Sequence, residues 1–144
     1  MKGAFLLDTN VPSELTKPLP NPQVVTWVHA QETPSLYVSA VTVGELRKGF
    51  ALLPRSKRRT QLEEWFELFF LPFFEDRVLP MTQRVGSRWG VLSAARQLGG
   101  TPLNTADGMI AATALEHGLT LVTRNTRDFA GLGLTLLNPW EDRP

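Results

Sequence analysis

The amino-acid sequence predicts an α/β fold with a central, mostly parallel sheet. Short apolar runs bounded by turn-forming residues alternate with longer segments of helical periodicity. This alternation is typical of parallel sheets with right-handed crossovers. The first run, Phe5–Leu7, is continuous, as expected of a strand buried on both faces. Asp8 follows it directly, at the carboxyl end of the strand, where open α/β sheets keep their ligand crevice.

The composition predicts one globular domain spanning residues 1–144. Hydrophobic residues make up 42% of the chain and charged residues 20%, which argues against a disordered chain. The absence of cysteine excludes disulfides, thiol nucleophiles and cysteine-based zinc sites, and it suits the cytoplasm. The apolar run before Asp8 is too short for a signal peptide, and no run approaches the ~20 residues of a membrane span. The net charge of +1 indicates no particular partner.

The first part of the chain is expected to form two short helices and a second strand. The first helix, from Val11 to Lys17, ends at a segment that is stiff because its prolines alternate with other residues. Asn21 and Pro22 then provide the N-cap and the first position of the second helix. The short apolar run Leu36–Ser39 is the second predicted strand.

The central part is expected to form two longer helices. The first begins at Thr42 and ends at Pro54, and its core-facing stripe recurs at three- and four-residue steps: Val43, Leu46, Phe50 and Leu53. The second runs from Ser56 to Leu71, is rich in aromatic residues and is expected to end at Pro72.

The last part repeats the alternation of strands and helices. Glycines are expected to end its helices at Gly99 and Gly118. The predicted elements, in order, are a strand at Val78–Pro80, helices at Thr82–Leu98 and Thr105–Glu116, a strand at Leu119–Thr123 and a candidate edge strand at Leu134–Leu137.

Two further acids occupy positions that amphipathic packing does not require. Glu45 lies off the apolar stripe in the first turn of its predicted helix. Asp107 lies in the first turn of an alanine-rich helix and shares its expected buried row with Ile110, Ala111 and Ala114. A buried carboxylate is costly unless it is paired or bound to a metal.

Each acid also has a purely structural interpretation. Asp8 is a good N-cap residue, Thr42-x-x-Glu45 has the form of a capping box, and Asn104-x-x-Asp107 approximates one. These interpretations weaken when the three acids are considered together, because each lies where a strand or loop leads into a helix. All three could converge on one sheet edge, where their mutual repulsion would favour Mg²⁺ or Mn²⁺.

Four sequence blocks occur in order along nearly the whole chain: Leu6-Leu7-Asp8-Thr9-Asn10, Ser39-x-x-Thr42-x-Gly44-Glu45-Leu46, Asp107-x-x-Ile110-Ala111-Ala112-Thr113-Ala114 and Leu121-Val122-Thr123-Arg124-Asn125-x-x-Asp128-Phe129. Together they resemble the PIN-domain ribonucleases. The sequence is most similar to the VapC toxins of type II toxin–antitoxin systems, in particular the FitB-like branch, which shares Asn138-Pro139-Trp140. The resemblance implies a PIN-like three-layer α/β/α fold.

The resemblance also implies a Mg²⁺- or Mn²⁺-dependent endoribonuclease that a cognate antitoxin holds silent. The acidic positions of the family correspond to Asp8, Glu45 and Asp107. The fourth position, which is often acidic, is Asn125 in this sequence. This difference leaves open whether Asp128, Thr123 or a water completes the site.

In this interpretation, a metal ion held by Asp8 and Asp107 lowers the pKa of a bound water and polarises a phosphoryl oxygen. Glu45 binds the metal directly, acts through a water, or helps to deprotonate the nucleophile. Short polar residues nearby are suited to orienting carboxylates or waters: Thr9, Asn10 and Thr123.

Basic and aromatic residues suggest further surfaces. Arg47 and Arg124, with Lys48 and Arg127, are near the acids in sequence and are candidate phosphate-binding residues or ordinary solvated surface. The aromatic stretch Trp65–Phe74 is expected to be mostly core, with part available for a homodimer face or an antitoxin groove. An RNA-tracking or partner-facing patch, or else a solvated helix start, is expected at Arg55, Lys57, Arg58 and Arg59.

Other function classes fit the sequence less well. A haloacid-dehalogenase-type phosphotransferase needs a second aspartate two residues after Asp8, where Asn10 stands, and a response-regulator receiver needs an acidic pair near the N-terminus. His29 and His117 are better interpreted as helix-surface residues than as a metal-free catalytic pair. A non-catalytic PIN-like module that binds RNA or protein stays open because of Asn125.

Overall fold

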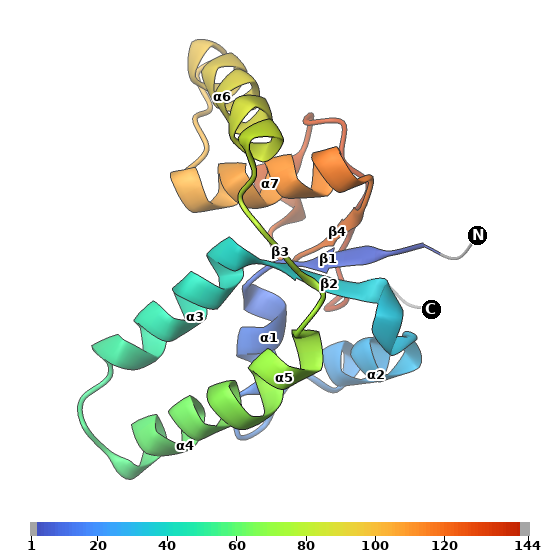
Figure 1. Cartoon of the computed structure of the whole chain (residues 1–144). Helices are drawn as coiled ribbons and strands as arrows, with labels where there is room; N and C mark the ends of the chain where they lie inside the picture. The colour runs from blue at the N-terminus through green and yellow to red at the C-terminus, as the bar shows by residue number, and fades with distance from the viewer. Residues whose placement is uncertain (1–2, 142–144) are drawn as a thin grey trace.

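The computed structural model describes residues 3–141, which form a five-stranded sheet covered by helices on both faces (Figure 1). The strand order is β3-β2-β1-β4-β5, and each of the four strand pairs formed by these residues is parallel. The strands are β1 Phe5–Leu7, β2 Leu36–Ser39, β3 Val78–Leu79, β4 Thr120–Val122 and β5 Leu136–Leu137. The predicted parallel α/β sheet and its edge strand at the C-terminal end are confirmed.

Two apolar cores lie on opposite faces of the sheet, which gives three layers. Successive strand residues point to opposite faces, so Leu7 packs in the core beneath α1 to α5, whereas Leu6 packs in the core beneath α6 and α7. Figure 1 shows these two helical layers on either side of the strands. No helix within residues 3–141 is long and apolar enough to cross a membrane.

Several helix boundaries follow from local sequence as predicted. The side chain of Asn21 accepts hydrogen bonds from the backbone N–H groups of Gln23 (2.8 Å) and Val24 (3.4 Å) and so caps its helix. Gly118 ends the last long helix in the left-handed conformation, with φ of 64°, which glycine adopts without strain. These helices are α2 Pro22–Ala30 and α7 Thr105–His117, and α6 spans Gln83–Leu98. Helix α1 spans Asn10–Leu15 and so ends before the predicted Lys17.

The third helix begins earlier than predicted. Helix α3 spans Ala40–Leu52, and Ser39, the last residue of β2, caps it by accepting a 3.0 Å hydrogen bond from Val41 N–H. Strand and helix therefore follow each other without a loop. Thr42 lies inside the first turn, so the predicted capping box with Glu45 does not form, and Glu45 lies in the second turn.

The predicted helix end at Pro72 is wrong. Helix α4 (Lys57–Trp65) continues through a π-helical turn, η2 (Phe66–Phe70), into α5 (Leu71–Phe74). The N–H of Leu71 bonds the carbonyl of Phe66, five residues earlier. Proline has no N–H, and its ring clashes with the carbonyl four residues earlier in a regular helix. The wider turn relieves this conflict, so that Phe73 and Phe74 remain on the helix.

Candidate functional site

The candidate site lies at the carboxyl edge of the sheet, where β1 and β4 end side by side. Leu7 pairs with Val122, so the next residues, Asp8 and Thr123, leave the sheet together. Asp8 is only 4% exposed. Its carboxylate accepts one hydrogen bond from the backbone N–H of Thr9 (2.8 Å) and one from the hydroxyl of Thr123 (2.7 Å).

Asp8 does not act as a helix cap. Helix α1 begins at Asn10 and has no side-chain cap hydrogen bond at its start. Burial raises the pKa of Asp8 to about 6, and the charges of Asp107 and Glu45 act in the same direction. The hydrogen bonds from Thr123 and Thr9 oppose this shift because they stabilise the ionised form. A buried acid with a raised pKa beside two other acids is typical of functional sites.

Glu45 reaches the site from α3 and is held by a hydroxyl. Its Oε1 accepts a 2.6 Å hydrogen bond from Thr9 Oγ1, and the same hydroxyl lies 2.9 Å from Oγ1 of Thr42. The backbone N–H of Thr9 contacts Asp8 at the same time. One residue, Thr9, therefore connects two of the three acids.

Asp107 both completes a helix cap and faces the site. Asn104 accepts a hydrogen bond from the backbone N–H of Asp107 (2.8 Å) and donates one from its amide to the Asp107 carboxylate (2.9 Å). Burial, and next the charge of Glu45, raise the pKa of Asp107, while the bond from Asn104 lowers it. Asp107 therefore belongs to a helix cap and to the candidate site at the same time.

The buried row that Asp107 begins was predicted correctly, but Asp107 itself lies at its half-buried end. Ile110, Ala111 and Ala114 are all 0% exposed, and Asp107 is intermediate. The cost of burying this charge is therefore smaller than the sequence pattern suggests.

The structure separates the roles of Asn125 and Asp128. Asn125 donates its backbone N–H to Thr123 Oγ1 (3.0 Å), and its side chain is exposed at the start of the 3₁₀ turn η3 (Thr126–Phe129). The negative charge of Asp128 raises the pKa of Asp107. Asp128 thus supplies a fourth negative charge near the site, where Asn125 supplies none.

The site residues match a hard divalent cation in donor type and charge. Carboxylate oxygens are the ligands that Mg²⁺ and Mn²⁺ prefer. The side-chain oxygen of Asn10 is buried and is one of two side-chain polar atoms in the described part of the chain that lack a hydrogen-bond partner. Its amide group donates to Thr123 at 3.4 Å. Within residues 3–141, however, no three acidic or histidine side chains are close enough to hold one ion together.

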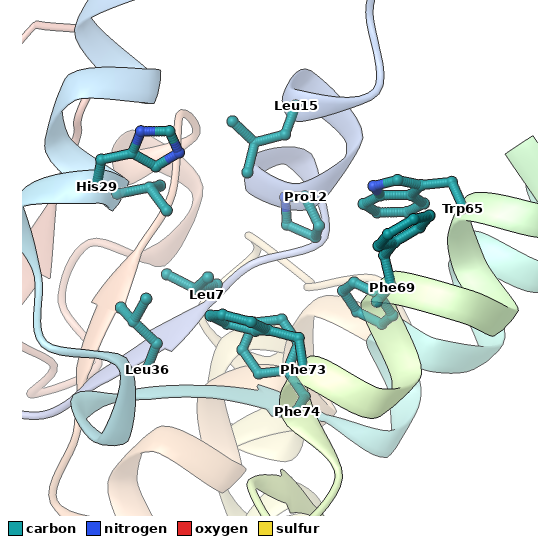
Figure 2. Close-up of a pocket in the computed structure, with 11 residues that line it drawn as sticks. Leu7, Pro12, Leu15, His29, Leu36, Trp65, Phe69, Phe73 and Phe74 are labelled. Atoms are coloured by element: carbon teal, nitrogen blue, oxygen red, sulfur yellow. The ribbon is translucent and has the colours of Figure 1, made fainter.

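An apolar cavity of about 230 Å³ lies away from the acids, between the aromatic helix and the α1–α2 region. Figure 2 shows Phe69 and Trp65 facing Pro12 and Leu15 of α1, with His29 of α2 at one side. Phe69 is 65% exposed and Phe73 45% exposed, although both are large apolar residues. The aromatic stretch is therefore part core and part open surface, as predicted.

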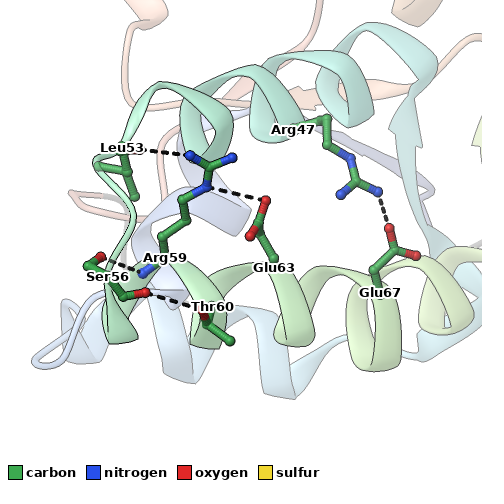
Figure 3. Close-up of polar contacts among 7 residues, drawn as sticks. All are labelled: Arg47, Leu53, Ser56, Arg59, Thr60, Glu63 and Glu67. Atoms are coloured by element: carbon green, nitrogen blue, oxygen red, sulfur yellow. Dashed lines mark hydrogen bonds and ion pairs between the residues drawn. The ribbon is translucent and has the colours of Figure 1, made fainter.

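The candidate phosphate-binding arginines are engaged with aromatic rings. Arg47 forms an ion pair with Glu67 (Figure 3), and its guanidinium lies 4.5 Å from the ring centroid of Phe66. The Arg124 guanidinium lies 5.5 Å from the ring centroid of Trp140. Arg47 lies in the middle of α3 and Arg124 follows the end of β4, and each aromatic contact favours one position of the guanidinium.

The predicted basic patch is not a set of four equivalent solvated charges. Arg58 donates to the carbonyl of Thr16 (2.6 Å). Arg59 donates to the carbonyl of Leu53 (3.0 Å) and pairs with Glu63 (3.5 Å), as Figure 3 shows. These two arginines connect the start of α4 to the ends of α1 and α3.

Sequence reasoning missed two residues that contact neighbours of the acids: Thr42, which contacts Thr9, and Trp140, which contacts Arg124. Thr42 was interpreted as a cap, and Trp140 was noted only for the resemblance. The sole signal for Thr42 was its spacing from Glu45, which suggested proximity but the wrong contact.

Comparison with known proteins gives a consistent result. The sequence profile of the PIN domain matches residues 5–133. The VapC ribonuclease Y4jK of Sinorhizobium fredii is 44% identical over 95% of this chain and 98% of its own length. The toxin FitB of Neisseria gonorrhoeae is 42% identical over 96% of this chain and 99% of its own length. The crystal structure of FitAcB from Neisseria gonorrhoeae superposes with a TM-score of 0.90 at 40% identity, covering 96% of this chain and 99% of that one.

Proposed function

This chain belongs to the PIN-domain family, and from that premise we propose that it is the ribonuclease toxin of a type II toxin–antitoxin pair. It hydrolyses RNA phosphodiesters in the cytoplasm with Mg²⁺ or Mn²⁺ as cofactor, and residues 1–144 act as one domain. The observation that carries the proposal is the buried Asp8, whose pKa is raised to about 6 beside Asp107 and Glu45. PIN-domain ribonucleases generally depend on a divalent metal.

Each group in the site has a distinct part in this reaction. Asp8 and Asp107 hold the cation, which when bound supplies Lewis acidity to the phosphoryl oxygen and lowers the pKa of its water. Glu45, oriented by Thr9, accepts a proton or a hydrogen bond from the attacking water. The unpaired Asn10 oxygen orients a second water. Arg124 binds phosphate from the rim of the site.

The test is cleavage of single-stranded RNA by the full chain with Mg²⁺ or Mn²⁺, compared with EDTA. We expect metal-dependent cleavage that EDTA abolishes and that metal restores. Binding of RNA without cleavage under any of these conditions would instead identify a non-catalytic binding module.

The same proposal includes a small antitoxin bound in the apolar cavity. Solved structures of similar fold are toxin–antitoxin complexes. A helix with apolar side chains fits a groove that exposes Phe69 and Phe73. An Arg or Lys of the antitoxin that reaches beyond the cavity to the acidic cluster would replace or crowd the metal by its opposite charge.

Copurification with the antitoxin from its native operon tests this partner. Phe69→Ser should weaken binding, because it removes an aromatic side chain from the groove. Leu52→Ser on α3 is the matched control, since Leu52 is also an exposed apolar residue (75%) but does not line the groove. Equal binding by both variants would contradict this location.

We further propose that a homodimer forms through α6. Its outer face exposes Val91 (72%) and Leu98 (88%) one above the other, seven residues apart. Val91→Glu should convert a dimer into a monomer in sedimentation equilibrium. A dimer of unchanged stability in that variant would exclude this face.

A further inference from the structure

We propose that Thr42 is a positioning residue for Glu45 and acts through the hydroxyl of Thr9. The inference rests on the proposed metal-dependent RNA hydrolysis and adds a residue to it. Thr42 touches neither substrate nor metal in this account. It sets the direction of a hydrogen bond that orients an acid of the site.

The geometry is a chain of two hydrogen bonds between separate segments. Thr42 is 0% exposed and lies on α3, and its Oγ1 is 2.9 Å from Oγ1 of Thr9, which follows β1. Thr9 Oγ1 is in turn 2.6 Å from Oε1 of Glu45. Thr42 and Glu45 are thus connected through a residue that is 33 positions away from Thr42 in sequence.

The number of hydroxyl protons determines which group is the donor in each of these two hydrogen bonds. Thr9 Oγ1 donates to Oε1 of Glu45, and this bond uses the only hydroxyl proton of Thr9. The oxygen of Thr9 is then available only as an acceptor toward Thr42, which must be the donor. The order Thr42 to Thr9 to Glu45 follows from the chemistry of the three groups.

This arrangement matters because an exposed glutamate side chain has many accessible rotamers. Glu45 is exposed, and a glutamate side chain loses considerable rotamer entropy when it is fixed. Thr9 fixes it while its own backbone N–H holds Oδ1 of Asp8 at 2.8 Å. The rotamer of Thr9 therefore sets the position of Glu45 relative to Asp8, and the buried hydroxyl of Thr42 holds that rotamer.

A buried threonine in a helix need not behave this way, and the chain offers a direct comparison. Thr113 is also 0% exposed and lies in α7, but its hydroxyl donates to the carbonyl of Met109 in its own helix (2.8 Å). Thr42 and Thr113 are thus matched in type, burial and secondary structure. They differ in the partners of the hydroxyl: that of Thr42 contacts the site residue Thr9, whereas that of Thr113 contacts Met109 and, at 3.9 Å, the sulfur of Met81.

The experiment compares Thr42→Val, Thr42→Ser and Thr113→Val in the full chain. Mn²⁺ affinity is measured by calorimetry without RNA, and kcat and KM are measured for RNA cleavage at saturating Mn²⁺. Thr42→Val should lower kcat or Mn²⁺ affinity by about tenfold and leave KM unchanged. A loss of this size is usual when a residue that orients a metal ligand is removed. Thr42→Ser should restore both values, and Thr113→Val should leave both unchanged.

A double variant tests whether Thr42 acts through Thr9. In a Thr9→Val background, Thr42→Val should have no further effect, because the intermediate hydroxyl is already absent. Full additivity of the two substitutions, or unchanged kcat and Mn²⁺ affinity in Thr42→Val alone, would overturn the inference. Thr42→Ala replaces Thr42→Val if the latter does not fold.

The two measurements separate this inference from the proposed function. Absence of RNA cleavage by the unmodified chain would overturn the proposed function, yet the Mn²⁺ titration would still decide the role of Thr42. Absence of both cleavage and Mn²⁺ binding would overturn both.

Discussion

The hydroxyl of Thr123 donates a 2.7 Å hydrogen bond to Oδ2 of Asp8, a residue 115 positions away in sequence. The contact follows from the parallel register in which Leu7 pairs with Val122. The bond stabilises the ionised carboxylate and so opposes the effect of burial on the Asp8 pKa. Pairing of β1 with β4 is thereby linked to the charge state of the candidate metal ligand.

The stability of the metal-free protein is expected to fall as the pH rises from about 4 to about 6. Burial raises the pKa of Asp8 from 3.8 to about 6, so in this interval the folded state keeps a proton that the unfolded state has lost. The resulting stabilisation is complete below the unfolded pKa and is lost as the pH passes the folded one. Its size is up to about 3 kcal/mol.

Urea unfolding in EDTA across this pH interval measures the effect. Asp8→Asn should remove most of the decline, because the amide does not titrate. An equal decline in the unmodified protein and in Asp8→Asn would assign the effect to other groups, such as Asp107, whose pKa is also raised.

Asp107→Asn is expected to abolish RNA cleavage without unfolding the protein. The substitution removes negative charge that the cation needs. RNA cleavage should therefore fall by more than the loss, about 10- to 100-fold, that follows removal of a residue that only orients a metal ligand. Because the charge of Asp107 also raises the pKa of Asp8, the metal-free variant should be at least as stable as the unmodified protein. Cleavage assays and thermal unfolding measure the two effects, and full turnover by pure Asp107→Asn would remove this residue from the site.

Asn125→Asp is expected to tighten metal binding. The exposed side chain gains a negative charge, while the hydrogen bond to Thr123 comes from the backbone N–H and is kept. In the RNA-free unmodified chain we expect one bound metal ion, since a second would add positive charge that the neutral Asn125 and the exposed, solvated Asp128 do not balance. Calorimetric titration with Mn²⁺ is the measurement. Two sites of similar affinity in the unmodified chain would show that this charge count is wrong.

Gly108→Ala is expected to destabilise the protein by about 1–3 kcal/mol through overpacking. A Cβ atom at this position would lie 2.8 Å from Nε1 and 2.9 Å from Cδ1 of Trp89, where α6 packs on α7. Gly86→Ala on α6 is the control, because nothing lies within 4 Å of its added Cβ. That substitution should stabilise by up to about 1 kcal/mol through helix propensity. Chemical denaturation measures the change in the free energy of unfolding for both variants. Changes of the same sign would contradict the packing argument.

Local sequence was sufficient for elements whose signals lie within a few residues. The apolar run Phe5–Leu7, the cap at Asn21 and the stop at Gly118 all appear in the structure as expected. Two boundaries were mispredicted because a competing arrangement was available. Ser39 can end a strand and cap a helix at once, and a π turn allows a helix to continue through Pro72.

The sequence by itself determined which acids are present and that each lies near a point where a strand or loop leads into a helix. Carboxylate chemistry and strand direction depend on residue type and local pattern alone, so Asp8 and Asp107 were identifiable without the fold. Only the tertiary structure decided which hydroxyl each acid contacts: Thr123 for Asp8 and Thr9 for Glu45. Those contacts depend on sheet register and on where α3 begins, which the packing of two cores across the whole chain determines.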